Sequence, residues 1–367
     1  MHALSALLMV VTILQASPPI EPAPAPADQR AQAQQSMRDA AVAFLASLDD
    51  KARALATRPF DDPARRNWSY VRGDRAGLFL SDMTPVQRAK AMALADSALS
   101  DAGRERVRLV QAIEEINRAD ELARKSEPTC GSDRYAILVF GDPMQTPWGW
   151  RLEGHHIGLH FSSVAGDTTT TPLFFGSFPA ALREGPGKGS RPLGVVQDAA
   201  LELRRSLTAE QLKLATIGDT VPADVITGPG REASLREAPT QGGIMMNDLT
   251  ASQRELLWGL VVRHALDLRG DLASDELRRI KTSGTERIRF GWAGVPQVDK
   301  PHYYRIAGPS FVMEFDCTQG NPDHVHCVWN DPDRNFGGDP PRDLLRDHVK
   351  EEQAPPPATP SGTSPTG

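Results

Sequence analysis

Histidine is concentrated in two stretches of this sequence, residues 148–161 and 302–329. Together they hold six of the nine histidines. An imidazole can bind a transition metal or transfer a proton near neutral pH, so this clustering points to chemistry. The sequence contains no Gly-x-Ser-x-Gly elbow, no His-Glu-x-x-His motif and no dinucleotide-binding fingerprint after an expected strand. The two stretches therefore predict a metal site or a site of acid–base catalysis.

The first stretch reads as a β-strand, in which alternate side chains face opposite sides of a sheet. On that expectation His156 lies between Gly154 and Gly158 on one face. The missing side chains leave room beside the imidazole for a ligand or another strand, although a bulge at either glycine would reverse the parity. His155 faces the other way, either as a hydrogen-bonded core residue or as part of a ligand site.

His324 and His326 are two residues apart in the second stretch, so they share one face of an expected strand. Glu314 and Asp316 share a face of the strand before it. Two histidines on one strand, a carboxylate on its hairpin partner and His156 from elsewhere would supply nitrogen and oxygen ligands with room for water. This is the usual composition of a catalytic zinc, copper or non-haem iron site.

We therefore expect a divalent transition metal, Zn, Cu or Fe, at a histidine and carboxylate site on β-strands. The expected metal ligands are His156, His324, His326 and Glu314. The expected proton acceptors from metal-bound water are Glu153 and Asp316. The expected ligand-binding residues are His155, His302, Trp150, Tyr304 and Arg305. The function that follows is a metal-dependent hydrolase or oxidoreductase acting on a small molecule.

Two other functions fit the same residues. A protein that holds a metal or small ligand without turnover would fill every coordination position with side chains. A structural module would use the same histidines in a buried network of hydrogen bonds. Binding of azide or cyanide at an open coordination position would favour catalysis over storage.

The sequence predicts an α+β protein whose N-terminal and middle parts are mainly helical. Apolar residues recur at three- and four-residue steps in residues 29–55, and further helices are expected over 85–100 and 102–125. A short strand is expected at 68–71.

Three Thr-x-x-Gln capping boxes begin at Thr84, Thr208 and Thr250, and each predicts the start of a helix. Their recurrence leaves two explanations open, an internal duplication or the chance repetition of a common helix start.

Residues 135–176 and 287–329 carry strand patterns, and the first group contains a reversal at residues 165–167. We expect an antiparallel sheet built from these two distant strand groups. The glycine-rich residues 183–193 lack the spacing of a phosphate-binding loop and are expected to be a plain connection.

Residues 1–14 contain no acidic residue, and an apolar run at 3–14 has the length of a signal-peptide core, too short to span a bilayer. No Lys or Arg precedes this run, and the best cleavage point, after Ala16, lacks a small residue two positions earlier. We expect a periplasmic or secreted protein without stable membrane insertion. A cytoplasmic location is the alternative if the run is not a signal.

The remaining composition bounds the domains and partners. Residues 17–28 form an extended Pro/Ala tether after the signal peptide, and residues 351–367 lack large apolar side chains and predict a disordered tail. Residues 29–350 are expected to form one domain, with a two-lobed body left open. The net charge of -6 and the absence of a basic run interleaved with aromatic residues argue against a nucleic-acid partner.

Several runs of this sequence resemble the domain-of-unknown-function 3500 family, which has no assigned activity. They are WGWRLEGHHIGLHF, PHYYRIAGPSFVMEFD, HVHCVWNDPDRNFGGD and GLFLSDMTPVQR. The likeness covers roughly residues 37–348 and implies that this body is one domain. It implies no reaction, so the site is argued from the residues.

Three positions depart from that family's pattern. Asn is more usual than His at the position of His160, which argues against His160 as an essential ligand. Cys317 and Cys327 stand where Asn and Ser are more usual, and they flank one expected hairpin turn. In an exported protein the two could form a cross-strand disulfide, and the alternative is a pair of unrelated buried thiols.

Overall fold

The computed structural model describes residues 27–218, 220–319 and 322–338. The predicted signal peptide at residues 1–14 and the predicted tail at residues 351–367 lie outside the described residues, so both stay predictions. The predicted domain bounds also stay predictions. Ala27 and Asp28, placed in the tether by the sequence, belong to the first helix. None of the helices in the described part is long and apolar enough to cross a membrane.

The described residues contain nine α-helices and twelve strands, so the predicted α+β class is confirmed. The helices are α1 (Ala27–Ala46), α2 (Asp50–Ala56), α3 (Pro85–Asp96), α4 (Asp101–Ala123), α5 (Gly194–Ser206), α6 (Ala209–Ala215), α7 (Glu232–Glu237), α8 (Ala251–Ala265) and α9 (Gly270–Thr282). The strands are β1 (Thr57–Arg58), β2 (Leu78–Phe79), β3 (Ala136–Phe140), β4 (Trp148–Gly154), β5 (Ile157–Val164), β6 (Asp167–Thr169), β7 (Leu173–Ser177), β8 (Ile244–Met245), β9 (Arg289–Gly294), β10 (His302–Gly308), β11 (Phe311–Asp316) and β12 (Val325–Asn330).

These strands form a single sheet in the order β1-β3-β4-β5-β7-β12-β11-β10-β9-β8, with β2 beside β3 and β6 beside β5. The sheet is mixed, because β1 pairs with β3 in parallel. The sequence predicted an antiparallel sheet. The central pair is β7 and β12, whose antiparallel register joins strands far apart in the sequence.

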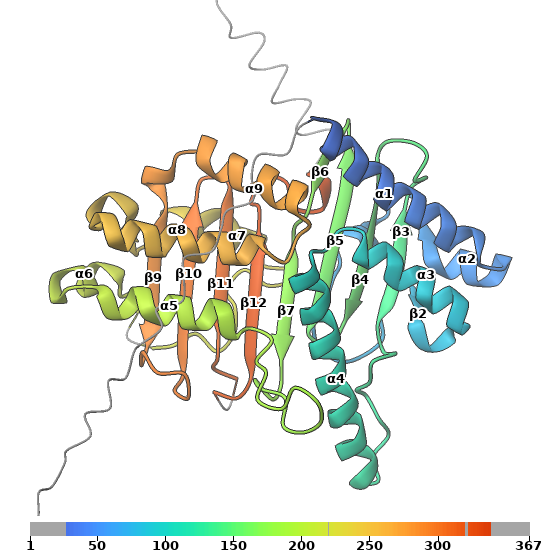
Figure 1. Ribbon diagram of the computed structural model, residues 1–367, viewed down its shortest axis with the longest axis horizontal. Coiled ribbons are helices and arrows are strands. Elements are labelled where there is room, and N and C mark those ends of the chain that lie inside the picture. The colour runs from blue at the N-terminus through green and yellow to red at the C-terminus, as the bar shows by residue number, and fades with distance from the viewer. Residues whose placement is uncertain (1–26, 219, 320–321, 339–367) are drawn as a thin grey trace, which may run out of the picture.

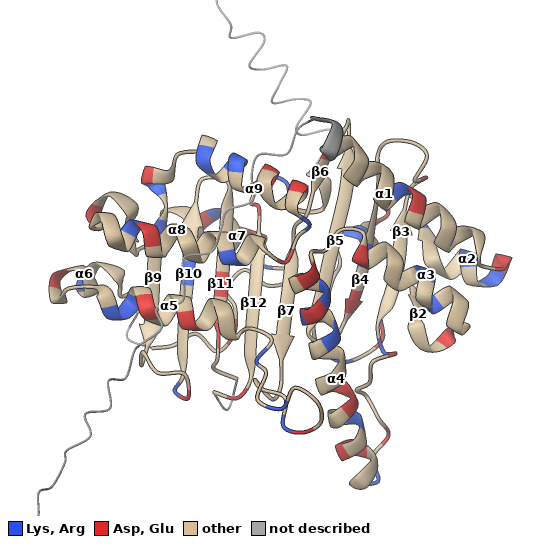
Figure 2. Cartoon of the chain, viewed as in Figure 1, with Lys and Arg blue, Asp and Glu red and all other residues tan. Residues whose placement is uncertain are grey.

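The two faces of the sheet differ in chemistry. The main helices α1, α3, α4, α5, α8 and α9 all cover one face, where apolar side chains such as Leu152, Phe175 and Trp329 form the core with them (Figure 1). Loops cover much of the other face, where Trp68, Tyr70, Phe174, Val225, Val328 and Phe336 form a smaller cluster. Figure 2 shows charged residues inside β4, β10 and β11, although most charges lie on helices and loops.

The buried charges of these strands lie on the loop-covered face, because the register aligns them there. Glu153 lies opposite Gly158, Asp316 opposite His326, and Arg305 opposite Glu314. Such groups are costly to bury unless they are paired or functional. This face therefore differs from an ordinary core.

The order of elements in the first half of the chain recurs in the second half. Each half begins with two helices and continues with a short edge strand (β2 or β8), two further helices and four core strands, from α1 to β7 and then from α5 to β12. Strands β1 and β6 in the first half and helix α7 in the second half are additions to this common order. The strand pairing also agrees between the halves. After the second helix of each half, a residue pairs in parallel with the first core strand: Thr57 with Val139 of β3, and Thr216 with Trp292 of β9. Leu173 and Trp329 pair where the halves meet. The fold is an internal duplication related by a pseudo-two-fold axis at that pair.

The capping boxes fit this duplication in part. Thr84 and Thr250 hold equivalent positions at the starts of α3 and α8, and both form complete boxes. The third box opens α6, whose counterpart α2 is capped by Asp49 instead. Two of the three boxes therefore reflect the repeat, and the third is a local helix start.

Two predicted elements in the N-terminal part of the chain were wrong. The helix expected over residues 29–55 is split into α1 and α2, because Asp49 caps a new helix start there. Residues 68–71 form no strand. Trp68 and Tyr70 instead pack against Phe174 on the loop-covered face, with ring centroids 5.9 and 4.1 Å from that of Phe174.

Candidate metal centre

A tight turn carries the first histidine pair. Gly154 pairs with Ile157, so His155 and His156 form the two-residue connection between β4 and β5. The single strand predicted for residues 148–161 is therefore wrong. His156 adopts a left-handed backbone conformation, with φ of 65°, which is uncommon for a residue other than glycine and is often found at functional sites. Its N–H donates to Tyr70 O and its carbonyl accepts from Gly176 N–H, which hold the turn.

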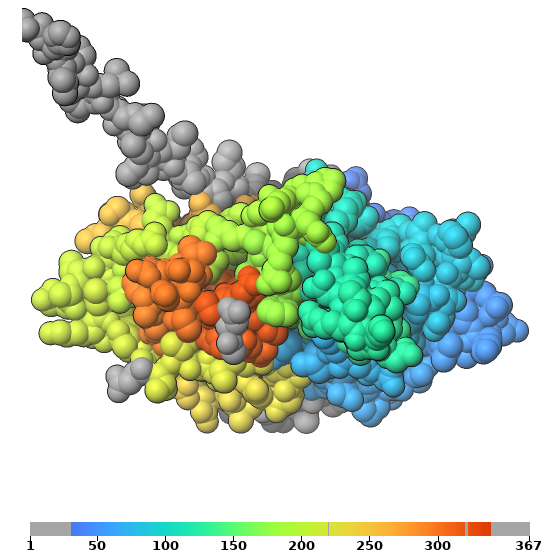
Figure 3. Space-filling model, turned by 90° about the horizontal axis from the view of Figure 1, so that it is seen from below, coloured from blue at the N-terminus to red at the C-terminus, as the bar shows by residue number. Residues whose placement is uncertain are grey.

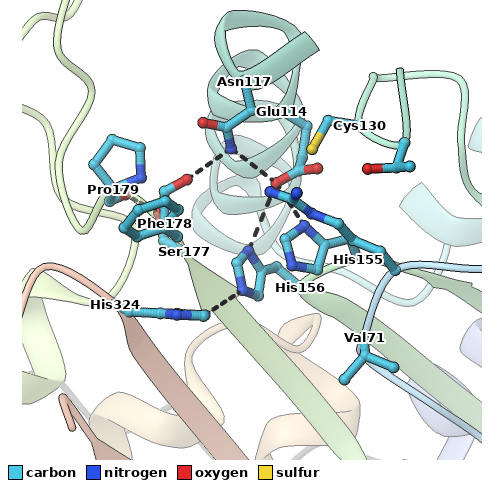
Figure 4. Close-up of polar contacts among 12 residues, drawn as sticks. Val71, Glu114, Asn117, Cys130, His155, His156, Ser177, Phe178, Pro179 and His324 are labelled. Atoms are coloured by element: carbon cyan, nitrogen blue, oxygen red, sulfur yellow. Dashed lines mark hydrogen bonds and ion pairs between the residues drawn. The ribbon is translucent and has the colours of Figure 1, made fainter. Parts of the chain in front are cut away.

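Three imidazoles meet at this end of the sheet. Nε2 of His324 lies 2.9 Å from Nε2 of His156 and 3.0 Å from Nε2 of His326. Figure 4 shows the first of these contacts between the rings of His324 and His156. Gly176 makes this approach possible, because a Cβ there would lie 2.6 Å from the ring of His156 and 2.8 Å from that of His326. The structure thus brings together three of the four predicted metal ligands.

Hydrogen bonds alone cannot satisfy this arrangement. Nε2 of His324 either carries one proton or offers one lone pair, so it can make a good hydrogen bond with only one of its two neighbouring nitrogens. The other pair of nitrogens remains 3 Å apart without a shared proton. A cation removes the conflict, since nitrogens bound tetrahedrally to one Zn²⁺ at about 2.0 Å lie about 3.3 Å apart.

Two carboxylates fix the orientation of His326. Its Nδ1 lies 3.0 Å from Asp224 Oδ1 and 3.3 Å from Asp316 Oδ2, and Tyr70 donates a hydrogen bond to the other oxygen of Asp224. A proton on Nδ1 leaves Nε2 turned toward the other two histidines. Burial disfavours charge on His326, but the two carboxylates outweigh burial and raise its pKa to about 9.

A third carboxylate lies behind His156. Glu114 Oε1 is 3.6 Å from Nδ1 of His156 and 2.9 Å from Nδ1 of His155. Burial would raise the pKa of Glu114, but the hydrogen bond with His155 and the nearby ring of His156 reverse this and hold the pKa well below the usual range. Carboxylates that hold the outer nitrogen of a metal-binding histidine are typical of protein metal sites. The cluster therefore has the outer contacts of a metal centre as well as the ligands.

The sequence offered one overlooked signal for Glu114. Within α4 the buried positions Val107, Val110, Glu114 and Asn117 follow helical spacing, so a carboxylate interrupts an apolar stripe. Such a residue is rarely buried without a partner. Asp224 had no comparable signal, because it lies in a segment without regular secondary structure, 102 residues before His326 in the sequence.

The cluster is largely buried and is partly open to solvent at His324 and Asp224. His156, His326 and Asp316 are buried, whereas His324 is partly exposed and the side chain of Asp224 retains 20% of its surface. The site lies at the lower end of the sheet in Figure 1, because β5 and β12 both begin there. Figure 3 views the molecule from this end, where residues of β12 and α4 lie near one another.

Other predicted site residues do not converge with the inner nitrogens of the three histidines. Glu314 accepts a hydrogen bond from Thr227 N–H, and burial raises its pKa to about 7, but it joins none of the described groups with converging ligand atoms. Glu153 pairs with Arg75 and Arg151. Asp316 lies behind His326, on the far side of the ring from the converging nitrogens. Its position suits a residue that orients His326.

The predicted pocket residues are also divided between locations. Only His155 adjoins the cluster, and its ring stacks on His156 with centroids 3.7 Å apart. Trp150, His302 and Tyr304 lie on the helix-covered face, where Trp150 stacks on Phe161, His302 on Trp292, and Tyr304 on Phe315. Arg305 lies on the opposite face and donates to Gln241 O. These residues do not line one pocket with the histidines.

The cysteines do not form the proposed disulfide. All three are free and buried. Cys327 lies opposite Phe315 in the register, so Cys317 is diagonal to it, and diagonal neighbours lie about 7–8 Å apart, too far for a normal disulfide. Cys317 Sγ instead lies 3.1 Å from Nδ1 of His302, and Cys327 Sγ lies 3.4 Å from Nδ1 of His264.

The geometry defines the class: a duplicated α+β protein with a histidine and carboxylate cluster at one end of its central sheet. Residues 30–338 match the family described as "Protein of unknown function (DUF3500)". The chain belongs to the DUF3500 family, as the resemblance in its sequence predicted. Neither the curated proteins nor the solved structures contain a match.

Proposed function

We propose that the protein is a metal-dependent enzyme whose cation is held by His156, His324 and His326. One observation carries this proposal, the contact of one nitrogen of His324 with ring nitrogens of both other histidines. The carboxylates beside the outer nitrogens support it: Asp224 bonds to His326, and Glu114 lies 3.6 Å from Nδ1 of His156, so the inner nitrogens face a common point.

Hydrolysis with Zn²⁺ is the reaction that this ligand set favours. Three imidazoles from the protein leave a position for water or substrate, which is the arrangement of many catalytic zinc sites. A bound Zn²⁺ would polarise a substrate oxygen and lower the pKa of a bound water molecule. The partly exposed His324 lies on the side from which a small substrate would enter. Copper or iron with oxidation is the alternative for the same ligands.

Elemental analysis of purified protein tests the metal directly. We expect one equivalent of transition metal at this site in protein produced with Zn, Cu and Fe supplied. The double variant His324→Ala/His326→Ala should lose that equivalent, because one histidine cannot hold the ion alone. The matched control is His160→Asn, which removes a buried imidazole whose Nδ1 bonds to Pro172 O outside the cluster.

The control should keep its metal. A double variant that binds as much metal as wild type, or metal-supplied wild-type protein that contains no metal, would refute the proposed site. Circular dichroism of each variant shows whether a loss of metal reflects unfolding. Azide or cyanide binding to the metal-loaded protein then separates an enzyme from a carrier, because a carrier with full coordination has no position for the anion.

We further propose that this enzyme is exported. The support is the apolar run at residues 3–14, followed by a Pro/Ala-rich segment. Expression of the full chain in its own host, followed by fractionation and mass measurement of its N-terminus, tests this. The expected result is a periplasmic or secreted product that lacks the apolar run. Full-length protein confined to the cytoplasm would contradict it.

A further inference from the structure

A second cluster of ligand-type side chains adjoins the three histidines. One ligand atom from each of Glu114, Cys130 and His155 lies within 4.8 Å of the other two. Glu114 and Cys130 are buried, and His155 is only slightly exposed. Figure 4 shows the three side chains together, beside the ring of His156.

The chain places the sulfur of Cys130 with a dedicated set of hydrogen bonds. After α4 the backbone turns back along that helix, and Glu121 on α4 accepts hydrogen bonds from the N–H groups of Thr129 and Cys130. The hydroxyl of Thr129 donates to the same carboxylate. These bonds fix the Cys130 backbone against α4 at Glu121, which lies on the same face of that helix as Glu114 and about two turns further along. These backbone hydrogen bonds thus fix the position from which the Cys130 side chain extends.

The surroundings of this thiol are acidic. Its sulfur lies 3.5 Å from Glu121 Oε1, and the carboxylate of Glu114 also faces it. Burial first, and the two carboxylates second, raise the pKa of Cys130 well above its usual value, and Arg72 opposes them. Arg72 is itself paired with Glu121. A thiol is a weak hydrogen-bond donor, so it compensates poorly for the buried carboxylate of Glu114 and the partly exposed one of Glu121. A cation would attract all of these groups.

We propose that Glu114, Cys130 and His155 form a second metal site, which takes a borderline cation such as Zn²⁺. Thiolate, imidazole and carboxylate are all zinc ligands. On binding, Cys130 releases its thiol proton to solvent, and Nδ1 of His155 exchanges its contact with Glu114 for the cation. The turn then gives one histidine to each site, His155 to this one and His156 to the first.

Cobalt(II) distinguishes the two sites, because only a thiolate ligand gives a strong sulfur-to-cobalt charge-transfer band in the near ultraviolet. We expect this band when the reduced full chain is titrated with Co²⁺. It should disappear in Cys130→Ser, with loss of one bound equivalent, and persist in the matched control Cys317→Ser/Cys327→Ser. The control removes the other two buried thiols and leaves Cys130 in place.

The variants also separate this inference from the proposed function. His324→Ala/His326→Ala should keep the charge-transfer band and lose the other equivalent. Wild-type protein that binds cobalt without the band, or Cys130→Ser that retains the band, overturns the second site and leaves the first intact. If Cys130→Ser proves unfolded by circular dichroism, His155→Ala gives the same test, since loss of this ligand should weaken or abolish the band.

Discussion

We expect the affinity of the three-histidine site for Zn²⁺ to rise about tenfold for each pH unit between about pH 6 and 8, because binding releases one proton. That proton belongs to His326, whose pKa the two carboxylates raise to about 9 despite its burial. His156 and His324 release none, because burial lowers the pKa of both, that of His324 to about 3. Three ordinary histidines would instead give a steeper dependence below about pH 6 and little change above about pH 7.

Competition with a chelator of known pH behaviour measures this dependence, and calorimetry in buffers of different ionisation enthalpy counts the released protons. Cys130→Ser serves as the background, so that only the first site is titrated. In Asp224→Asn/Asp316→Asn the carboxylates no longer hold a proton on His326, so the affinity should level off near about pH 7. An affinity of the background protein that does not change with pH in this range would contradict the assignment of His326 as a protonated ligand.

The strands and most helices could be predicted because their signals are local. Apolar runs mark residues 136–140 and 311–316, and capping boxes mark the starts of α3 and α8. Membership of the DUF3500 family was also visible in the sequence. The approach of His324 and His326 followed from strand alternation alone.

The site could be predicted only in part because its other members depend on tertiary structure. The two turn residues, His155 and His156, are not the glycine or asparagine that usually indicate such a turn in a sequence. The left-handed conformation of His156 is stabilised by hydrogen bonds with Tyr70 and Gly176, which the sequence does not show. Glu314 looked equivalent to Asp316 by alternation. The register places only Asp316 opposite His326.

The second half of the chain contains a turn equivalent to that of His155 and His156, but without histidine. The turn between β4 and β5, which contains His156, corresponds to the turn between β10 and β11, which contains Ser310. Glu114 is the fourteenth residue from the start of α4, and Ser283 is the fourteenth from the start of the equivalent helix α9. Ser310 donates to Ser283 over 3.0 Å, so the same two positions meet in both halves. The fold thus brings the turn and the helix into contact in both halves. Only in the first half are the side chains at this contact a carboxylate and an imidazole, which can bind a metal or transfer a proton.

We expect Glu276→Gln to raise the free energy of unfolding at pH 8 by about 3 kcal/mol and to change it little near pH 4.5. Glu276 is buried in α9, and burial raises its pKa to about 7, although Arg334 and Arg279 oppose this. Because the folded pKa lies above the unfolded value of about 4.3, the folded state keeps a proton that the unfolded state loses. Stability from this proton is complete below about pH 4.5 and is lost as the pH rises through 7.

Glutamine keeps the shape of Glu276 and can still accept the hydrogen bond from Thr170 Oγ1, so the variant differs mainly in charge. Urea unfolding of wild type and variant at pH 5 and 8 measures the difference. Glu202→Gln, which neutralises an exposed carboxylate on α5, is the matched control and should leave the free energy of unfolding almost unchanged at both pH values. Equal stabilisation at pH 5 and 8 would show that packing, and not the buried charge, causes the effect. A Glu276→Gln protein less stable than wild type at pH 8 would mean that Arg279 and Arg334 stabilise the ionised carboxylate more than burial penalises it.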